Sequence, residues 1–452
     1  ALERLVESAL LFMDDRRQHA RFGILEPVRQ YLLALHNPES RSRAYERASE
    51  SLLHLIESLG VSPENPLTIE RQDAMDEEHE NLALLWDWTI SHRPDLAVRF
   101  ASSLAAYELA RGRGKACQAR VLAVQDHWMA MGPETRMEME LIKATLAIGR
   151  LQKQDASEPL TTAEGLATVA GGGSCTARLA LLRAAHRFFT DYQSSEAAGK
   201  DALDKCSEFG SPYLIGLAHR QLGSIYHYAH QSEAAISHLG KAFSLLSDQG
   251  ALDLAAYTAL FQSNLLWQAD RREEARKSFD LAKEMMTASK DPACIAFLHE
   301  SQGRLALSDG RPEEAESCFR ESLRLWQMLG SDFQQADQLL SLTRALIDQG
   351  KWKDASEALA TSADYWLKDR NEGGLCQSLS SLALILHVSG RTDEAKRALG
   401  YSVHYQAEAG LVLVKPEIEF RQRIIDLVGG IEDPAEPLDI AGAHTMFKLL
   451  EL

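Results

Sequence analysis

The sequence has 452 residues and a mass of 50.2 kDa, with 45% hydrophobic and 25% charged residues. This is the composition of a folded globular chain, and it excludes disorder and collagen. With 48 Lys and Arg against 65 Asp and Glu, the net charge is −17, which argues against direct contact with nucleic acid or an anionic membrane. No apolar run approaches the roughly 18 residues that cross a bilayer, and no signal peptide is visible.

The first 36 residues predict a helix, a strand and a second helix. We expect Ala1–Phe12 to be helical, Met13–His19 to form a turn, Arg21–Leu25 to be a strand and Glu26–Leu35 to return to helix. This order is typical of the end of a small winged-helix domain. Because the chain begins inside that unit, we expect it to be part of a longer protein.

Weaker amphipathic segments follow and predict further helices. They cover Leu96–Met131 and Met137–Gln154, and Leu179–Gly210 resembles one imperfect helical pair. The glycine-rich stretch Gly171–Ser174 predicts a loop between helices. It cannot be a phosphate-binding Walker loop, because no Lys-Ser/Thr follows it.

The strongest signal is an internal repeat with a period of 40 residues. Five alanines share one phase, and a small residue stands twelve positions before each of them. A larger apolar residue follows each alanine at +4 and another small residue at +7, which places all three on one helix face. The alanines are Ala235, Ala275, Ala315, Ala355 and Ala395, and the preceding small residues are Gly223, Ser263, Gly303, Thr343 and Ala383.

Turns rich in helix-breaking residues precede the alanines. The pattern therefore predicts that each unit consists of a helix, a short turn and a second helix. One hairpin cannot bury its apolar face alone, so the units must stack. Their pattern resembles the tetratricopeptide repeat, whose small, glycine, alanine, aromatic and serine positions are matched by Gly303, Gly310, Ala315, Phe319 and Ser322. The unit exceeds the usual repeat by about six residues, which we place in longer helices or loops.

A terminal helix is predicted at Lys415–Val428, since proline stands near its start and two glycines follow it. We therefore predict an all-α chain, a right-handed tetratricopeptide-like solenoid preceded by a partial winged-helix segment. The expected units are the end of the winged helix at 1–45, a helical linker with degenerate pairs at 46–160, the repeats at 161–410 and C-terminal capping helices at 411–452.

The N-terminal part also resembles a known class. The segments Ala1–Leu11 and Arg21–Tyr31, followed by Glu78-His79-Glu80-Asn81-Leu82 with Trp86 and Trp88, look like the winged helix and linker of signal-transduction ATPases with numerous domains, the STAND class. They are most similar to bacterial transcriptional regulators of LuxR type and of the antibiotic-regulatory type. That class commonly ends in tetratricopeptide repeats that sense an inducer or partner.

In the wider class, a Met-His-Asp motif in the winged helix senses the nucleotide phosphate. Its positions here are Ile24, Leu25 and Glu26, so the histidine is missing. The resemblance implies that ATP or ADP binds an upstream domain. We expect no cofactor in this chain itself.

No catalytic motif is present. Gly112–Lys115 lacks the upstream glycine and the following Ser or Thr of a Walker loop, and neither a His-Glu-x-x-His nor a Gly-x-Ser-x-Gly pattern occurs. The histidines His219, His227 and His230 share one helix and could in principle converge on a metal, although ordinary core or surface histidines are far more common. The six cysteines form no Cys-x-x-Cys pair. We therefore expect neither an enzyme nor a metal protein.

The remaining candidate is the groove lined by the first helix of each repeat. Arginines recur there and could hold a carboxylate or phosphate, or equally make salt bridges between repeats. The Lys and Asn clamp of chaperone-tail receptors is not reproduced, because Ser224 and Leu340 stand in its place. Carrying the family's inward positions through the period gives Arg220, His227, Tyr228, Tyr257, Asn264, Trp267, Glu300, Arg304, Arg344 and His387.

These observations predict a cytoplasmic sensor and interaction scaffold of a bacterial STAND-class regulator. Its groove would bind a protein, peptide or small-molecule inducer and so control its own upstream ATPase domain, with no direct contact to nucleic acid or membrane. The alternative is a free-standing tetratricopeptide scaffold without an ATPase. A regulatory arm of an enzyme would need a catalytic domain that this sequence does not contain.

Overall fold

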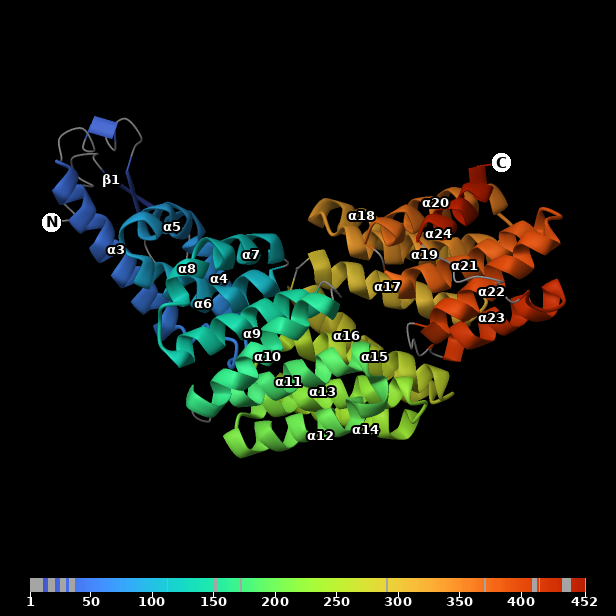
Figure 1. The fold of residues 1–452 in the computed structure, drawn as a ribbon, viewed down its shortest axis with the longest axis horizontal. Helices are drawn as coiled ribbons and strands as arrows, with labels where there is room; N and C mark the ends of the chain where they lie inside the picture. Colours follow the sequence, from blue (N-terminus) through green and yellow to red (C-terminus); the bar gives the residue numbers. More distant parts are fainter. Residues whose placement is uncertain are drawn as a thin grey trace.

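The computed structural model describes residues 11–14, 21–24, 30–31, 37–111, 113–149, 153–170, 173–289, 292–369, 371–408, 413, 415–432 and 440–451. Nearly all of these residues are helical (Figure 1). Among them, no helix combines the length and apolar character that a membrane span requires.

Two short strands precede the helices. β1 (Leu11–Asp14) pairs antiparallel with β2 (Arg21–Ile24), so that Leu11 lies opposite Ile24. β2 confirms the predicted strand. The expectation of helix at residues 11–12 and of turn at 13–14 was wrong, because these residues pair with β2, and ladder hydrogen bonds outweigh weak local helix propensity. The predicted helix at residues 1–10 lies outside the described residues.

Six helices form an N-terminal helical arm, drawn in blue and blue-green in Figure 1. Their apolar faces meet in two buried clusters that contain Ile56, Met75, Phe100 and Trp128. The first helix of the arm spans the expected boundary at residue 45. The helices are α3 (Pro38–Ser58), α4 (Ile69–Glu77), α5 (His79–His92), α6 (Pro94–Ala110), α7 (Gly114–Ala123) and α8 (Gln125–Trp128).

Seven antiparallel helical hairpins follow and stack on one another, which confirms the predicted tetratricopeptide-like solenoid. The first helices are α9 (Pro133–Gly149), α11 (Ser174–Thr190), α13 (Pro212–Tyr228), α15 (Leu252–Gln268), α17 (Pro292–Ser308), α19 (Asp332–Asp348) and α21 (Glu372–Val388). The second helices are α10 (Lys153–Ala170), α12 (Tyr192–Phe209), α14 (Ser232–Asp248), α16 (Arg272–Ser289), α18 (Pro312–Leu329), α20 (Trp352–Asp369) and α22 (Thr392–Glu408).

The additional residues of the 40-residue period lie in the helices. From α13 to α22 each helix has 17 or 18 residues, and the two helices of a hairpin are joined by a tight turn. The turns need one residue with positive φ. Gly310, Gly350 and Gly390 supply it in the later hairpins, and His230 (φ 57°) and Asp270 (φ 60°) adopt the same conformation in the earlier ones.

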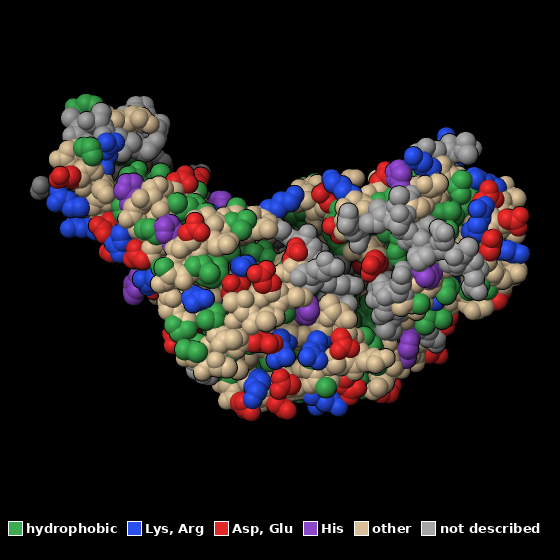
Figure 2. Space-filling view, viewed as in Figure 1, with side chains coloured by type: hydrophobic (Ala, Val, Ile, Leu, Met, Phe, Trp, Pro, Cys, Tyr) green, Lys and Arg blue, Asp and Glu red, His purple; other side chains and the backbone are tan. Residues whose placement is uncertain are grey.

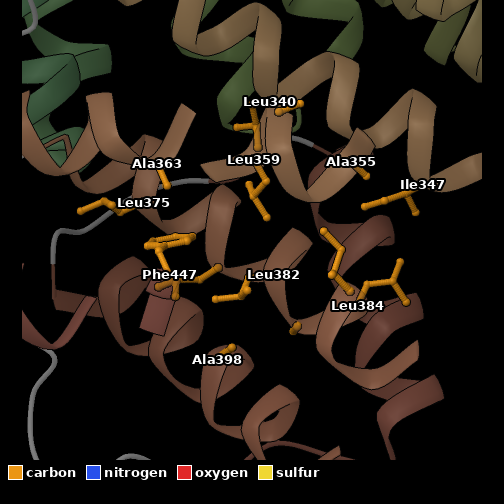
Figure 3. Packing of buried hydrophobic residues seen from close by; sticks show 14 of the residues in the cluster. Leu340, Ile347, Ala355, Leu359, Ala363, Leu375, Leu382, Leu384, Ala398 and Phe447 are labelled. Carbon is orange, nitrogen blue, oxygen red and sulfur yellow. The ribbon is translucent and has the colours of Figure 1, made fainter. Parts of the chain in front are cut away.

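The five repeat alanines are all fully buried where the second helix meets the first. Small residues on the first helix permit this approach. A Cβ atom on Gly303 would lie 2.6 Å from Phe319 Cε1, and one on Gly223 would lie 2.7 Å from Leu239 Cγ. The pattern of small and large residues therefore sets the distance between paired helices. Figure 3 shows this packing for the last hairpins, with Leu359 and Leu382 in the core.

The stack curves toward its first helices. Most successive first helices contact one another, as α15 does with α17 and α19 with α21, whereas contacts between successive second helices are sparse. The first helices therefore line the inner side of the curve. We call the surface formed by α13, α15, α17, α19 and α21 the first-helix channel. Figures 1 and 2 show the resulting crescent, with the N-terminal helical arm and the last hairpins at opposite ends.

Three C-terminal elements complete the fold. The predicted terminal helix is present as α23 (Lys415–Val428), and it contacts α21 and α22. The short helix α24 (Ile440–Phe447) and the 3-10 helix η1 (Lys448–Glu451) pack against α20. Helix α23 therefore packs on α21 and α22, whereas α24 and η1 pack on α20.

Candidate ligand-binding channel

The first-helix channel contains an acidic and basic cluster at its centre. Arg304 of α17 pairs with Glu300 one turn earlier (2.7 Å) and with Asp337 of the next first helix (3.4 Å). Gln338 Nε2 donates to Glu300 Oε2 at 2.7 Å. Arg304 therefore makes the salt bridge between repeats that the sequence left open as an alternative. Its side chain nevertheless stays 51% exposed, whereas that of Glu300 is 12% exposed.

Burial governs the electrostatics of this cluster. It raises the pKa of Glu300, and Asp337 adds to the effect, while Arg304 and Gln338 oppose it. Glu300 in turn raises the pKa of Arg304, which remains charged. Because the nearly buried carboxylate of Glu300 depends on Arg304 for compensation, removing Arg304 leaves an uncompensated negative charge there, whereas Arg304 without Glu300 keeps its pair with Asp337.

Helix α23 occupies the C-terminal end of the channel. Arg344 Nη2 of α19 donates to the Pro416 carbonyl at 3.4 Å, and its guanidinium lies 4.2 Å from the centre of the Phe420 ring. Arg423 pairs with Asp348 at 3.2 Å. The charge of Glu417 also acts on both Arg304 and Arg344. The protein thus fills this end of the channel with its own helix.

Aromatic side chains lie further toward the N-terminal end. Tyr228 packs edge-on against Phe188, with ring centres 5.1 Å apart, and His227 packs edge-on against Phe261 at 5.4 Å. Burial raises the pKa of Tyr228 to about 12 and lowers that of His227 to about 4, so both side chains are neutral near pH 7. Asn264 is half-buried on α15, the helix that carries Phe261.

The three histidines weighed above as a possible metal site do not converge. His219 Nδ1 lies 2.9 Å from Nδ1 of His238 on α14, His227 faces Phe261, and His230 lies in the turn. Within the described residues, no group of three metal-binding side chains is found.

Two predicted channel residues lie near the hairpin turns. Trp267 stacks on the guanidinium of Arg272 at 4.1 Å, at the turn between α15 and α16. His387 Nδ1 lies 3.3 Å from Thr392 Oγ1, at the turn between α21 and α22. The structure therefore does not bring these two side chains to the Arg304 cluster.

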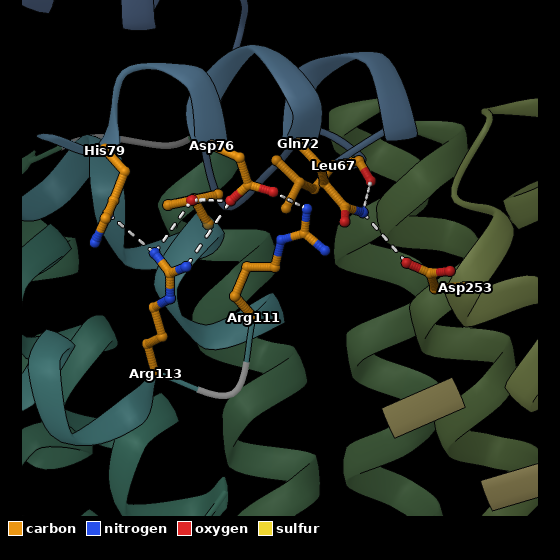
Figure 4. Close-up of polar contacts among 8 residues, drawn as sticks. Leu67, Gln72, Asp76, His79, Arg111, Arg113 and Asp253 are labelled. Atoms are coloured by element: carbon orange, nitrogen blue, oxygen red, sulfur yellow. Dashed lines mark hydrogen bonds and ion pairs between the residues drawn. The ribbon is translucent and has the colours of Figure 1, made fainter. Parts of the chain in front are cut away.

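A cavity of about 370 Å³ lies where the N-terminal helical arm meets the channel. Leu67, Gln72 and Leu109 line it from the arm, and Tyr213 and Tyr257 line it from α13 and α15. The two walls are joined by a hydrogen bond from Gln72 Nε2 to Asp253 Oδ2 at 3.2 Å (Figure 4). Tyr257 also packs edge-on against Phe297 at 5.0 Å.

Arg220 is not among the residues that line this cavity, but its charge interacts with two tyrosines that do, Tyr213 and Tyr257. Burial lowers its pKa. The arginine that lines the cavity, Arg178, is 6% exposed and pairs with Glu138 at 2.5 Å.

The Glu-His-x-Asn-Leu segment has a structural role here. His79 Nδ1 is 3.1 Å from Arg113 Nη1, and Asp76 pairs with both Arg111 and Arg113 from the connection between α6 and α7 (Figure 4). Asn81 Nδ2 donates to Glu78 Oε2 at 2.7 Å. The contacts of Asp76 and His79 with Arg111 and Arg113 join α4 and α5 to the ends of α6 and α7.

The winged-helix motif position can be placed only in part. Ile24 ends β2 and lines a shallow apolar groove with Tyr45 and Leu52 of α3 and Leu84 of α5. Leu25 and Glu26 lie outside the described residues.

Sequence reasoning missed the residues that connect distant elements. Asp337, Gln338, Glu417 and Phe420 complete the central cluster and the α23 contact. Gln72 joins the N-terminal helical arm to Asp253. No local pattern marks such residues, because their partners are up to 181 positions away in the chain.

Comparison of the sequence with protein-family models and with curated proteins finds no match. Solved structures are similar in fold. A Rap protein complexed with competence and sporulation factor is 13% identical, covering 75% of this chain and 98% of its own, with a TM-score of 0.52. NprR in complex with its cognate peptide NprX is 11% identical over 87% of this chain and 100% of its own, with a TM-score of 0.46.

A STAND protein with a tetratricopeptide repeat sensor from Pyrococcus horikoshii is also similar. It is 14% identical, covering 82% of this chain and 58% of its own, with a TM-score of 0.42. At such identities the likeness to the Rap protein establishes a tetratricopeptide-like fold and nothing finer.

Proposed function

We propose that this chain is the sensor and interaction scaffold of a STAND-class transcriptional regulator, of LuxR type or of the antibiotic-regulatory type. An inducer, peptide or protein partner binds in the first-helix channel and controls an upstream ATPase domain. That domain carries the nucleotide chemistry and this chain is not an enzyme. The channel is the observation that carries this proposal, because it combines an exposed charged cluster at Arg304 with a cavity that also touches the N-terminal helical arm.

The position of the cavity supports the coupling step. A ligand changes an equilibrium only when it binds two arrangements with different affinity. The cavity walls come from both the arm and the repeats, and Gln72 and Asp253 join them by one hydrogen bond. Ligand binding there favours one position of the arm relative to the solenoid. The arm follows the segment that resembles the winged helix, so this movement is transmitted toward the ATPase.

The test uses the protein encoded by the whole reading frame. ATP hydrolysis is measured with and without compounds that stabilise the chain thermally, in the wild type and in Gln72→Ala. The proposal predicts that a compound changes the hydrolysis rate and that Gln72→Ala weakens this response without abolishing compound binding. Absence of ATP hydrolysis in the whole protein would favour the free-standing scaffold.

A further inference from the structure

The cavity between the N-terminal helical arm and the channel is lined on its repeat side by one carboxylate and two tyrosines. Asp253 and Tyr257 lie one turn apart on the same face of α15, and both line the cavity. Tyr213 lines it from α13. The fold therefore brings a negative charge and two aromatic side chains to one enclosed space.

Asp253 carries its negative charge without a cationic partner. Its Oδ2 accepts a hydrogen bond from Gln72 Nε2 at 3.2 Å (Figure 4), and its Oδ1 accepts one from Cys294 Sγ at 3.6 Å. Both donors are neutral. Within the part of the chain that the structure describes, Asp253 forms no ion pair. A carboxylate offers about four acceptor positions, so Asp253 can accept further hydrogen bonds from a ligand.

The cation that the structure places in the cavity lining is already compensated. Arg178 Nη1 lies 2.5 Å from Glu138 Oε2 and 3.9 Å from Glu64 Oε2. Because Arg178 is paired with two carboxylates, it does not neutralise Asp253. The charges around the cavity are therefore negative on balance, which favours a cationic ligand over an anionic one.

The tyrosines add groups that attract a cation and carry no charge of their own. The face of a tyrosine ring attracts an ammonium group, and the hydroxyl oxygen can accept a hydrogen bond from it. Burial raises the pKa of Tyr213 to about 12, so its hydroxyl stays neutral near pH 7. Leu67, Leu109 and Leu254 supply an apolar part of the lining that suits the body of a ligand.

We propose that the cavity binds a small organic cation, an amine with an apolar body, whose ammonium group is held by Asp253 beside Tyr213 and Tyr257. The ammonium group donates a charge-assisted hydrogen bond to the carboxylate, and this compensates the charge of Asp253. A volume of about 370 Å³ suits a small molecule rather than a helix or a long peptide. This inference rests on the proposed ligand-binding role of the channel and names the class of ligand.

The test measures binding of matched primary amines, alcohols and carboxylates to the whole chain. Their bodies run from butyl to decyl and from benzyl to phenylbutyl, and saturation-transfer NMR and isothermal titration measure the binding. Asp253→Asn removes the charge while keeping side-chain size and one acceptor oxygen for Gln72. Asp280→Asn, at an exposed position of α16, is the matched control. Ala106→Leu is a second variant that fills the cavity from α6 and leaves Asp253 in place.

The wild type and Asp280→Asn are expected to bind the best amines roughly tenfold more tightly than the matching alcohols, and to bind the carboxylates most weakly. Asp253→Asn should lose the advantage of amine over alcohol, and Ala106→Leu should weaken the binding of both. An amine preference that persists unchanged in Asp253→Asn would overturn the inference, because it would reflect the overall negative charge of the chain. Unchanged amine binding in Ala106→Leu would place the site elsewhere and would overturn it as well.

Two results in the wild type alone would also overturn the inference. One is tighter binding of alcohols or carboxylates than of the matching amines, which would leave the cavity as a ligand site of another class. The other is the failure of every amine to bind. In both cases the ATP-hydrolysis test would still decide the proposed function, because it uses any compound that stabilises the chain.

Discussion

Ser362 Oγ donates a hydrogen bond to the carbonyl of Ala336 at 2.8 Å, and this bond joins the two helices of one hairpin. The same relationship recurs one period away in each direction. Ser322 donates to Ala296 at 2.9 Å, and Ser402 donates to Cys376 at 2.8 Å. The last three hairpins therefore share both a small side chain and a buried hydrogen bond at this phase. Alanine stands there in the two earlier hairpins, as Ala242 and Ala282.

Replacing this serine should cost only the hydrogen bond. Because alanine already occupies the phase elsewhere, Ser362→Ala fits without a clash, and the free energy of unfolding should fall by about 0.5–1.5 kcal/mol. Chemical denaturation followed by circular dichroism measures the change. Thr361→Ala on the exposed side of α20 should leave stability almost unchanged, and an equal loss in both variants would refute the role of the bond.

A methyl group at Gly303 should be far more damaging than the same change in an open helix position. The added Cβ meets the Phe319 ring at 2.6 Å, so Gly303→Ala should lower stability by about 1–3 kcal/mol. Gly165 of α10 has no atom within 4 Å of the added position, and alanine favours a helix. Gly165→Ala should therefore raise stability by a few tenths of a kcal/mol up to about 1 kcal/mol. Thermal unfolding of both variants checks this opposite sign.

The contact between His219 and His238 should make stability depend on pH. The two rings share a hydrogen bond, so at least one of them is neutral. Burial and the charges of His238 and Lys241 lower the pKa of His219 to about 4. In the unfolded chain, His219 takes up a proton near pH 6.5, whereas in the native chain it does so only near pH 4. The free energy of unfolding should therefore fall as the pH falls from about 7 toward 4.

Urea unfolding at pH 7.5 and pH 5.0 measures this dependence. His219→Asn removes one titrating group, so the loss of stability between the two pH values should be smaller than in the wild type. His54→Asn, at an exposed position of α3, is the matched control. The same pH dependence in His219→Asn and the wild type would contradict the account.

The docking of α23 should depend on Phe420. Phe420→Ala removes the ring that lies 4.2 Å from the Arg344 guanidinium, so α23 should exchange its backbone amides faster. Hydrogen–deuterium exchange over residues 415–428 measures this directly. Leu427→Ala, at a side chain that is 55% exposed, should change the exchange little. Unchanged exchange in Phe420→Ala would mean that other contacts hold the helix.

The repeat could be predicted because its determinants are local. Ala315, Phe319 and Ser322 lie on one helix face, and their spacing alone gives the hairpin and its stacking. The channel was harder to derive. Arg304 was found through the period, but its partner Asp337 belongs to the next hairpin, and Glu417 arrives from α23.

Residues near the ends of first helices show why the period alone is insufficient. Trp267 and His387 were extrapolated from a shorter repeat, whereas the first helices here have 17 residues. The last turn of such a helix lies beside the hairpin turn, where Arg272 and Thr392 contact these two side chains. Strand β1 was missed because its pairing with β2 depends on a partner outside its own sequence window.

The central claim is that the first-helix channel binds the ligand. The most direct measurement is the hydrogen–deuterium exchange footprint of any metabolite or peptide that raises the melting temperature of the whole chain in a library screen. The account predicts slower exchange in the first helices α13, α15 and α17 and in α4, which faces the cavity. Slower exchange confined to the second helices α14, α16 and α18 would contradict it.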